Sequence, residues 1–140
     1  MLDLNTKFGR FAKKCIKSEY FVWLTTVDST GTPQPRPVWF LWEDESFLIF
    51  SQAKAHKVAH IKKNPKVALH FNTDKTGDKH VIVFVGDASI DANCPPAHEV
   101  PKYFKKYKEG ISNLDMTPEG FSDEYCIAIR IHPTEIRGWE

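Results

Sequence analysis

The segment with the most distinctive chemistry is "PQPRPVWF", residues 33–40, which places proline at every second position and then becomes aromatic. Residues two apart in an antiparallel strand direct their backbone groups to the same side. Pro33, Pro35 and Pro37 therefore leave one side with carbonyl acceptors but without N–H donors. These carbonyls, with the N–H of Trp39, could bind the polar rim of a flat heterocycle such as the pyrimidine end of a flavin. The alternative is that the prolines only protect an edge strand from aggregation.

A basic segment follows, "SQAKAHKVAHIKKNPK", residues 51–66, which contains five lysines and no acid. We expect a strand that ends in hydroxyl and amide side chains to give way here to the start of a helix, an arrangement that holds phosphate groups. The side chains of Ser51 and Gln52, backbone donors and either Lys54 or Lys57 are predicted to surround the phosphate, and Lys57 is favoured over a merely solvated position. Lys62, Lys63 and Lys66 are interpreted as a solvated helix face.

No metal site is expected. His56 and His60 are four residues apart and could share a helix face, but no acidic or third imidazole ligand accompanies them at a recognisable spacing. There is no GxSxG motif, and the three cysteines, Cys15, Cys94 and Cys126, form no CxxC or Cys/His pattern. The sequence therefore identifies no catalytic residue, and the cysteines are interpreted as small apolar residues in a reducing compartment.

The composition argues against several classes of protein. The 140-residue chain has 19 Lys and Arg against 18 Asp and Glu, a balance that does not fit a protein coating nucleic acid or an anionic membrane. No run approaches the ~20 apolar residues needed to span a bilayer, and the first residues lack the apolar stretch of a signal peptide. We therefore expect a single cytoplasmic domain over residues 1–140, without a nucleic-acid or membrane partner.

Strands are the main elements that must position these residues. Six are predicted, in "YFVWLTTV", the proline segment up to the polar turn "EDES", "FLIFSQ", "KVALHFNT", "HVIVFVGDASID" and "YCIAIRIHPTEIRGW". An amphipathic helix is predicted after Asn5 or Thr6, a short one within "AKAHKVAHIKKNP", and a third from Pro95-Pro96 to about Glu109. Residues 110–124 are predicted to be a mobile surface connection. This pattern predicts a mostly β protein, an antiparallel barrel with peripheral helices.

Several segments together resemble the pyridoxamine 5'-phosphate oxidase-like, FMN-binding split-barrel flavoproteins. The likeness extends from about Tyr20 to Trp139 and is carried by "LTTVDSTGTPQPRPVWFLWEDESFLIFSQ", "KVAHIKKNPKVALHFN", "VGDASID" and "IHPTEIRGW". Three further segments, "EVPKYFKKYKEGI", "LDMTPEGFSDEY" and "IRGW", are similar to the subgroup of deazaflavin (F420)-dependent oxidoreductases. The resemblance implies a six-stranded antiparallel split β-barrel.

The resemblance also implies a homodimer with two cofactor sites at the subunit interface. Four residues would border the ring system: Arg36, Pro37, Val38 and Trp39. Ser51, Gln52, Lys54 and Lys57 would approach the phosphate, as the basic segment already predicts. Trp139 would come from the other subunit, which would explain a tryptophan in a terminal segment that ordinarily frays. The ending "RGWE" differs from the Arg-Leu-x-Pro type of segment that helps true pyridoxamine 5'-phosphate oxidases bind substrate, so that activity is not expected.

The leading functional hypothesis is an oxidoreductase in which bound F420 or FMN transfers hydride to a small, conjugated acceptor. The subgroup resemblance favours F420, whose acidic tail could lie near Lys62, Lys63 or the basic first helix. The alternative is a protein that sequesters a flavin, F420 or haem without turnover, because the same pocket would serve. A third interpretation is a dimeric structural module with an empty groove.

Overall fold

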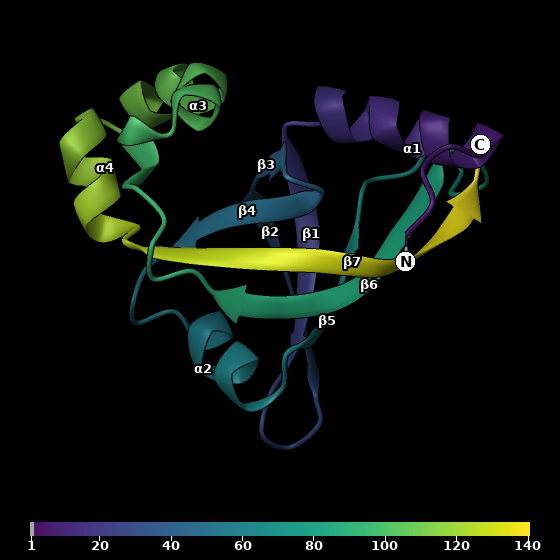
Figure 1. Ribbon diagram of the computed structural model, residues 1–140, viewed down its shortest axis with the longest axis horizontal. Helices are drawn as coiled ribbons and strands as arrows, with labels where there is room; N and C mark the ends of the chain where they lie inside the picture. The colour runs from purple at the N-terminus through teal and green to yellow at the C-terminus, as the bar shows by residue number, and fades with distance from the viewer. Residues whose placement is uncertain (1) are drawn as a thin grey trace.

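A computed structural model describes residues 2–140 as a curled antiparallel sheet with helices at its periphery (Figure 1). The strands lie in the order β2-β1-β5-β6-β7-β4-β3. Their bounds are β1 (Phe21–Val27), β2 (Pro33–Trp39), β3 (Leu41–Glu43), β4 (Ser46–Ser51), β5 (Lys66–His70), β6 (Val81–Ile90) and β7 (Ile127–Trp139). The sheet forms a half-barrel of the split-barrel type, so the predicted mostly β fold is confirmed.

The sheet has seven strands instead of the predicted six, because the proline strand breaks at Phe40. β2 pairs with β1, whereas β3 pairs with β4 at the other end of the strand order. Side chains of α3 (Pro101–Asn113) replace a neighbouring strand at the break. The Phe40 N–H donates to the Tyr107 hydroxyl at 2.8 Å, and Lys106 Nζ donates to the Phe40 carbonyl at 2.9 Å. The two ends of the sheet are thus covalently joined, which requires the sheet to curl.

In residues 2–140 five helical segments flank the sheet. Besides α3 they are α1 (Lys7–Ser18), α2 (His56–Lys63), the short 3-10 helix η1 (Ala97–Glu99) and α4 (Pro118–Glu124). Thr6 caps α1, as predicted, by accepting a hydrogen bond from the Gly9 N–H at 2.9 Å. None of these helices is long and apolar enough to cross a membrane.

The predicted surface connection at residues 110–124 is wrong, because most of this segment is helical. α3 begins and ends later than predicted, and α4 begins after Thr117, whose side chain accepts from the Gly120 N–H at 3.0 Å. Pro118 occupies the first turn, where its missing N–H costs nothing. Phe121 on the same helix is buried. Packing of this side chain stabilises a helix whose Gly and Pro content suggests a loop.

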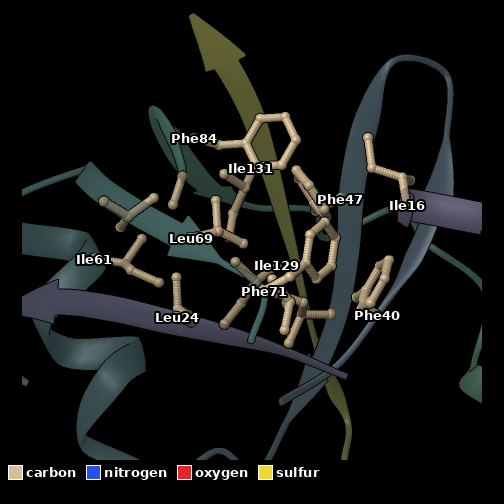
Figure 2. Close-up of a cluster of buried hydrophobic side chains, with 14 of the residues drawn as sticks. Ile16, Leu24, Phe40, Phe47, Ile61, Leu69, Phe71, Phe84, Ile129 and Ile131 are labelled. Atoms are coloured by element: carbon tan, nitrogen blue, oxygen red, sulfur yellow. The ribbon is translucent and has the colours of Figure 1, made fainter. Parts of the chain in front are cut away.

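The hydrophobic core has two parts. One fills the barrel, where labelled side chains such as Ile16 of α1, Ile61 of α2, Leu69 of β5 and Phe84 of β6 point toward one another (Figure 2). The other lies between the sheet and the helices η1, α3 and α4. Figure 1 shows α3 and α4 together on one side of the sheet and α1 on the other. The second core fixes the helices that face the outer surface of β1 and β2.

Candidate functional site

An apolar groove of about 500 Å³ lies between the β1-β2 pair and the helices α3 and α4. Its aromatic lining consists of Phe21, Trp23, Trp39, Phe50, Tyr103, Phe121 and Tyr125. The alternation of β1 buries Val22 and Leu24 in the barrel and therefore turns Phe21 and Trp23 outward to the groove. Pro37, Val38 and Lys57 also line this groove. Its size and mostly apolar lining are those of a small-molecule site.

A polar groove of about 530 Å³ adjoins it and shares two of its residues, Pro37 and Lys57. Its polar side chains include Thr26, Asp28, Gln34, Arg36, His56 and His60. It lies between the outer part of β2 and the first turn of α2, whose unpaired backbone N–H groups favour anions. The two grooves could hold the two ends of one ligand, with a flat apolar part in one and an anionic part in the other.

Lys57 stands where the two grooves meet. Its side chain is half-buried, and burial, assisted by the nearby Arg36 guanidinium, lowers the pKa of its ammonium group. Neither cation forms an ion pair with a carboxylate anywhere in residues 2–140. Two like charges held together in this way repel each other, and a bound anion would relieve that repulsion.

Asp28, the acid that lines the polar groove, already accepts hydrogen bonds from residues close to it in the sequence. Hydrogen bonds, of which the one from the Thr30 hydroxyl is the strongest and the one from Gln34 the next, lower the pKa of Asp28 well below its usual range. His60 is also engaged, with its Nδ1 atom 2.8 Å from the Thr26 hydroxyl. No group of three or more His, Cys, Asp or Glu side chains in residues 2–140 is placed to hold a metal ion. Positive charge at Lys57 and Arg36 thus dominates the groove.

The prolines of β2 lie on an open edge of the sheet. β2 ends the strand order and pairs only with β1, in a register that places Pro35 opposite Thr25 and Pro37 opposite Trp23. The backbone groups of these prolines therefore face away from β1, as the sequence predicts. The Pro35 carbonyl already accepts a hydrogen bond from Arg36 Nη1 at 2.7 Å. The Pro37 carbonyl is left as the acceptor on that edge nearest to both grooves.

Trp39 contributes to the apolar groove in a way that the sequence does not indicate. Its ring stacks on Tyr107, with centroids 4.6 Å apart and planes 6° apart, and on Phe121 at 5.8 Å and 22°. These two rings take up part of the stacking surface of Trp39 and hold its ring in place beside the groove.

Four other predicted residues do not line either groove. Ser51 is buried and its hydroxyl donates to the Gln52 carbonyl at 3.1 Å, while the Gln52 amide donates to Glu124 at 2.7 Å. Lys54 is exposed beside α2. Trp139 lies at the end of β7 near α1 (Figure 1), where its Nε1–H donates to the Asp78 carbonyl and its backbone pairs with β6. The same chain thus holds this terminal tryptophan, although its side chain is 54% exposed.

The structure therefore brings together five predicted residues: Arg36, Pro37, Val38, Trp39 and Lys57. Sequence reasoning missed the groove residues contributed by α3 and α4, chiefly Tyr103, Phe121 and Tyr125. The sequence did contain a signal for Tyr103, because Tyr103, Tyr107 and Ile111 follow helical spacing and mark a buried face. That spacing could not show which surface of the sheet the face would cover.

Comparisons with known proteins show which family this architecture represents. The family model described as pyridoxamine 5'-phosphate oxidase matches residues 9–140. No curated protein sequence matches the chain significantly.

Several solved structures share the fold. A conserved hypothetical protein from Mycobacterium tuberculosis, Rv2991, is similar with a TM-score of 0.76 and 18% identity, over 100% of this chain and 88% of that one. A structure named F420 Reductase has a TM-score of 0.65 and 22% identity, over 89% of this chain and 94% of that one. HutZ, a heme storage protein from Vibrio cholerae, has a TM-score of 0.65 and 15% identity, with coverages of 97% and 94%. Identities this low show a common fold only.

Proposed function

The chain belongs to the pyridoxamine 5'-phosphate oxidase family, whose model matches residues 9–140, and from this premise we propose that it is an oxidoreductase using bound F420 or FMN. The predicted family is confirmed, while the cofactor and the reaction are our proposal. Similarity to the structure named F420 Reductase supports F420 as one of the two candidates. Pyridoxamine 5'-phosphate oxidation itself is not the activity that we propose.

The observation that carries the proposal is the pair of cations, Lys57 and Arg36, at the junction of an apolar and a polar groove. Lys57 and Arg36 would bind the cofactor phosphate, and the ring system would lie in the apolar groove along the edge of β2. The Pro37 carbonyl and the N–H of Trp39 would meet the polar rim of the ring. Ser51, Gln52, Lys54 and Trp139 remain predictions from the family resemblance.

In this proposal the protein itself binds and orients the cofactor and excludes water from it. When bound, a flavin or deazaflavin supplies the hydride chemistry. The aromatic wall of Phe21, Trp23 and Phe121 would exclude water, and Trp39, held by stacking on Tyr107 and Phe121, would fix the position of the cofactor ring. A small, conjugated acceptor would occupy the remaining space in the same apolar groove.

We also propose a homodimer, because β2 leaves an open strand edge and the outward side chains of β1 are aromatic. The exposed Trp139 would then reach a cofactor site of the partner subunit. Light scattering at micromolar concentration is expected to give twice the mass of the chain. A stable monomer under these conditions would contradict an interfacial site.

One observation favours the alternative of binding without turnover. Among residues 2–140 the apolar groove is lined by no carboxylate and no histidine, so its titratable side chains are those of Lys57 and two tyrosines, and Lys57 is assigned to the phosphate. Sequestration of a flavin, F420 or haem therefore remains the second candidate. Reduced F420 or FMN on the protein should be reoxidised by added quinones, biliverdin or nitroaromatics if the protein is an oxidoreductase, and should persist unchanged if it only binds.

The phosphate assignment is tested by titrating FMN and F420 into the wild-type and Lys57→Ala proteins. A hydrogen bond to a charged group contributes roughly 1.5–3 kcal/mol, and about 1.4 kcal/mol is a factor of ten. Lys57→Ala should therefore weaken binding by roughly 10- to 100-fold, measured as the dissociation constant by fluorescence titration. The fold should survive, because Lys57 is only half-buried.

Lys62→Ala is the matched control, since this exposed lysine lies on the same helix but lines neither groove. It should weaken binding by less than about threefold. Both titrations are repeated at several salt concentrations, because diffuse attraction fades with screening whereas a direct contact largely persists. Equal losses in the two variants that disappear at high salt would show that α2 is merely a basic surface.

A further inference from the structure

Tyr103 is a buried tyrosine whose hydroxyl group has no evident structural role. The residue is 1% exposed and lies on the face of α3 that lines the apolar groove. Its ring packs edge-on against Phe50, with centroids 4.9 Å apart, and tilts against Tyr107 at 4.7 Å. The ring is thus held in one position by the second core, and the hydroxyl group at its tip is fixed with it.

The Tyr103 hydroxyl has no hydrogen-bond partner among residues 2–140. It is nevertheless not enclosed, because in the same residues Arg130 Nη1 is the one fully buried side-chain polar atom that lacks a partner. Part of the hydroxyl is therefore accessible, and Tyr103 lines the apolar groove. Buried polar groups are nearly always paired, and one that is left free beside a cavity is available to whatever fills it.

This hydroxyl can act only as a neutral donor or acceptor. Burial, with smaller contributions from Tyr107, Tyr20 and Tyr125, raises the pKa of Tyr103 far above its ordinary value, so the group keeps its proton. The neighbouring side chains of the groove are mostly apolar or aromatic, and Tyr125 is the other tyrosine that lines it. A ligand atom that accepts a hydrogen bond from Tyr103 must carry a lone pair, as a carbonyl oxygen or an imine nitrogen does.

We infer that Tyr103 donates a hydrogen bond to a carbonyl oxygen or imine nitrogen of the planar conjugated ligand in the apolar groove, and that it selects ligands with an acceptor at that point. The inference rests on the proposed function, which supplies the planar ligand. Two sources have this chemistry, the ring of the cofactor and an acceptor substrate beside it. Tyr125 is the rival donor in the groove, but it is only half-buried and so reachable by water.

The test compares Tyr103→Phe with the wild-type protein in two binding titrations. The first uses FMN and F420, whose rings carry carbonyl groups. The second uses the cofactor-loaded protein with 9-fluorenone and with fluorene, a pair of flat ligands that differ by the presence of a carbonyl group. Loss of one neutral hydrogen bond should raise the dissociation constant of the ligand that Tyr103 contacts by roughly 2- to 10-fold. The dissociation constant of fluorene should not change. Quenching of tryptophan fluorescence provides the readout.

Two variants serve as controls. Tyr20→Phe makes the same chemical change at a residue that is 44% exposed and outside the groove, and it should leave both titrations unchanged. Tyr125→Phe tests the rival donor. Circular dichroism should report an unchanged fold in all three variants, because Tyr103 has no hydrogen bond to lose.

The outcomes separate the two proposals. A loss for the cofactor assigns Tyr103 to the cofactor ring, and a loss for fluorenone alone assigns it to the acceptor substrate; either supports the inference. Unchanged affinity in both titrations, equal losses for fluorenone and fluorene, or a loss confined to Tyr125→Phe would overturn it. If the wild-type protein binds neither FMN nor F420, the proposed function fails instead.

Discussion

Tyr103 and Tyr107 lie one turn apart on the same face of α3, and both are almost completely buried. The Tyr107 hydroxyl is fully engaged, since it lies 2.6 Å from the Tyr20 carbonyl, 2.8 Å from the Phe40 nitrogen and 2.9 Å from the Phe40 carbonyl. The Tyr103 hydroxyl has no such contacts within residues 2–140, and Tyr103 lines the apolar groove. Two identical side chains on one helix thus differ in role because different parts of the sheet lie opposite them.

Close contacts surround the Tyr107 side chain. Lys106 Nζ lies 3.7 Å above the Phe40 ring and also donates to the Phe40 carbonyl. At Gly110 an added Cβ would lie 2.5 Å from the Tyr20 hydroxyl and 2.9 Å from the Trp39 ring, so only glycine allows α3 to approach this closely. The region around Tyr103 lacks such contacts at its polar end. One turn of α3 thus secures the strand break, and the previous turn lines the apolar groove.

The largest effect that follows from this difference is on stability. Tyr107→Phe should lower the free energy of unfolding by about 1–3 kcal/mol, because it leaves the buried Phe40 N–H without an acceptor. Urea denaturation followed by circular dichroism would measure the loss. FMN or F420 affinity of the folded variant should change little, because the ring that supports Trp39 is retained.

Tyr103→Phe is the matched control for stability, with the same chemical change at the same burial. It should alter the free energy of unfolding by less than about 0.5 kcal/mol, since no hydrogen bond within residues 2–140 is lost. Equal destabilisation by the two variants would remove the distinction between a closed and an open region.

A smaller effect is expected from pH. Burial and Arg36 lower the pKa of Lys57, so in the ligand-free protein Lys57 gives up its proton at a lower pH than an ordinary lysine. A bound phosphate favours the charged form. Cofactor affinity should therefore be highest below this lowered pKa and fall as pH rises through it, by up to roughly tenfold for the loss of one charged hydrogen bond. Dissociation constants measured from pH 7 to 10 provide the test.

The Lys57→Ala protein separates this effect from titration of the ligand, because it should lack the decline. The contribution of Tyr107 to stability should stay nearly constant up to about pH 9 and begin to fall toward about pH 10, because burial raises the pKa of Tyr107 in the folded protein, whereas a tyrosine of the unfolded chain ionises near its ordinary pKa of about 10. A decline in affinity that is identical in both proteins would exclude Lys57 as its source.

Local patterns predicted much of the fold correctly. Alternation in β1 and β6, the cap at Thr6 and the edge position of the proline strand all depend on groups within a few residues of one another. The family resemblance implied that Arg36 and Lys57 belong to one cofactor site, and both line the polar groove. The break at Phe40 was not predicted, because the residues that replace the missing strand, Lys106 and Tyr107, are more than sixty residues away in the sequence.

The amino-acid sequence alone determined that this chain is a mostly β protein with an open proline edge and a basic helix start, because periodicity, capping and missing N–H groups act locally. Only the tertiary structure decided which side chains line the two grooves. It paired Gln52 with Glu124, stacked Trp39 on Tyr107 and Phe121, and left the Tyr103 hydroxyl without a partner among residues 2–140. These outcomes depend on where α3 and α4 pack against the sheet, and that placement follows from contacts between segments far apart in the chain.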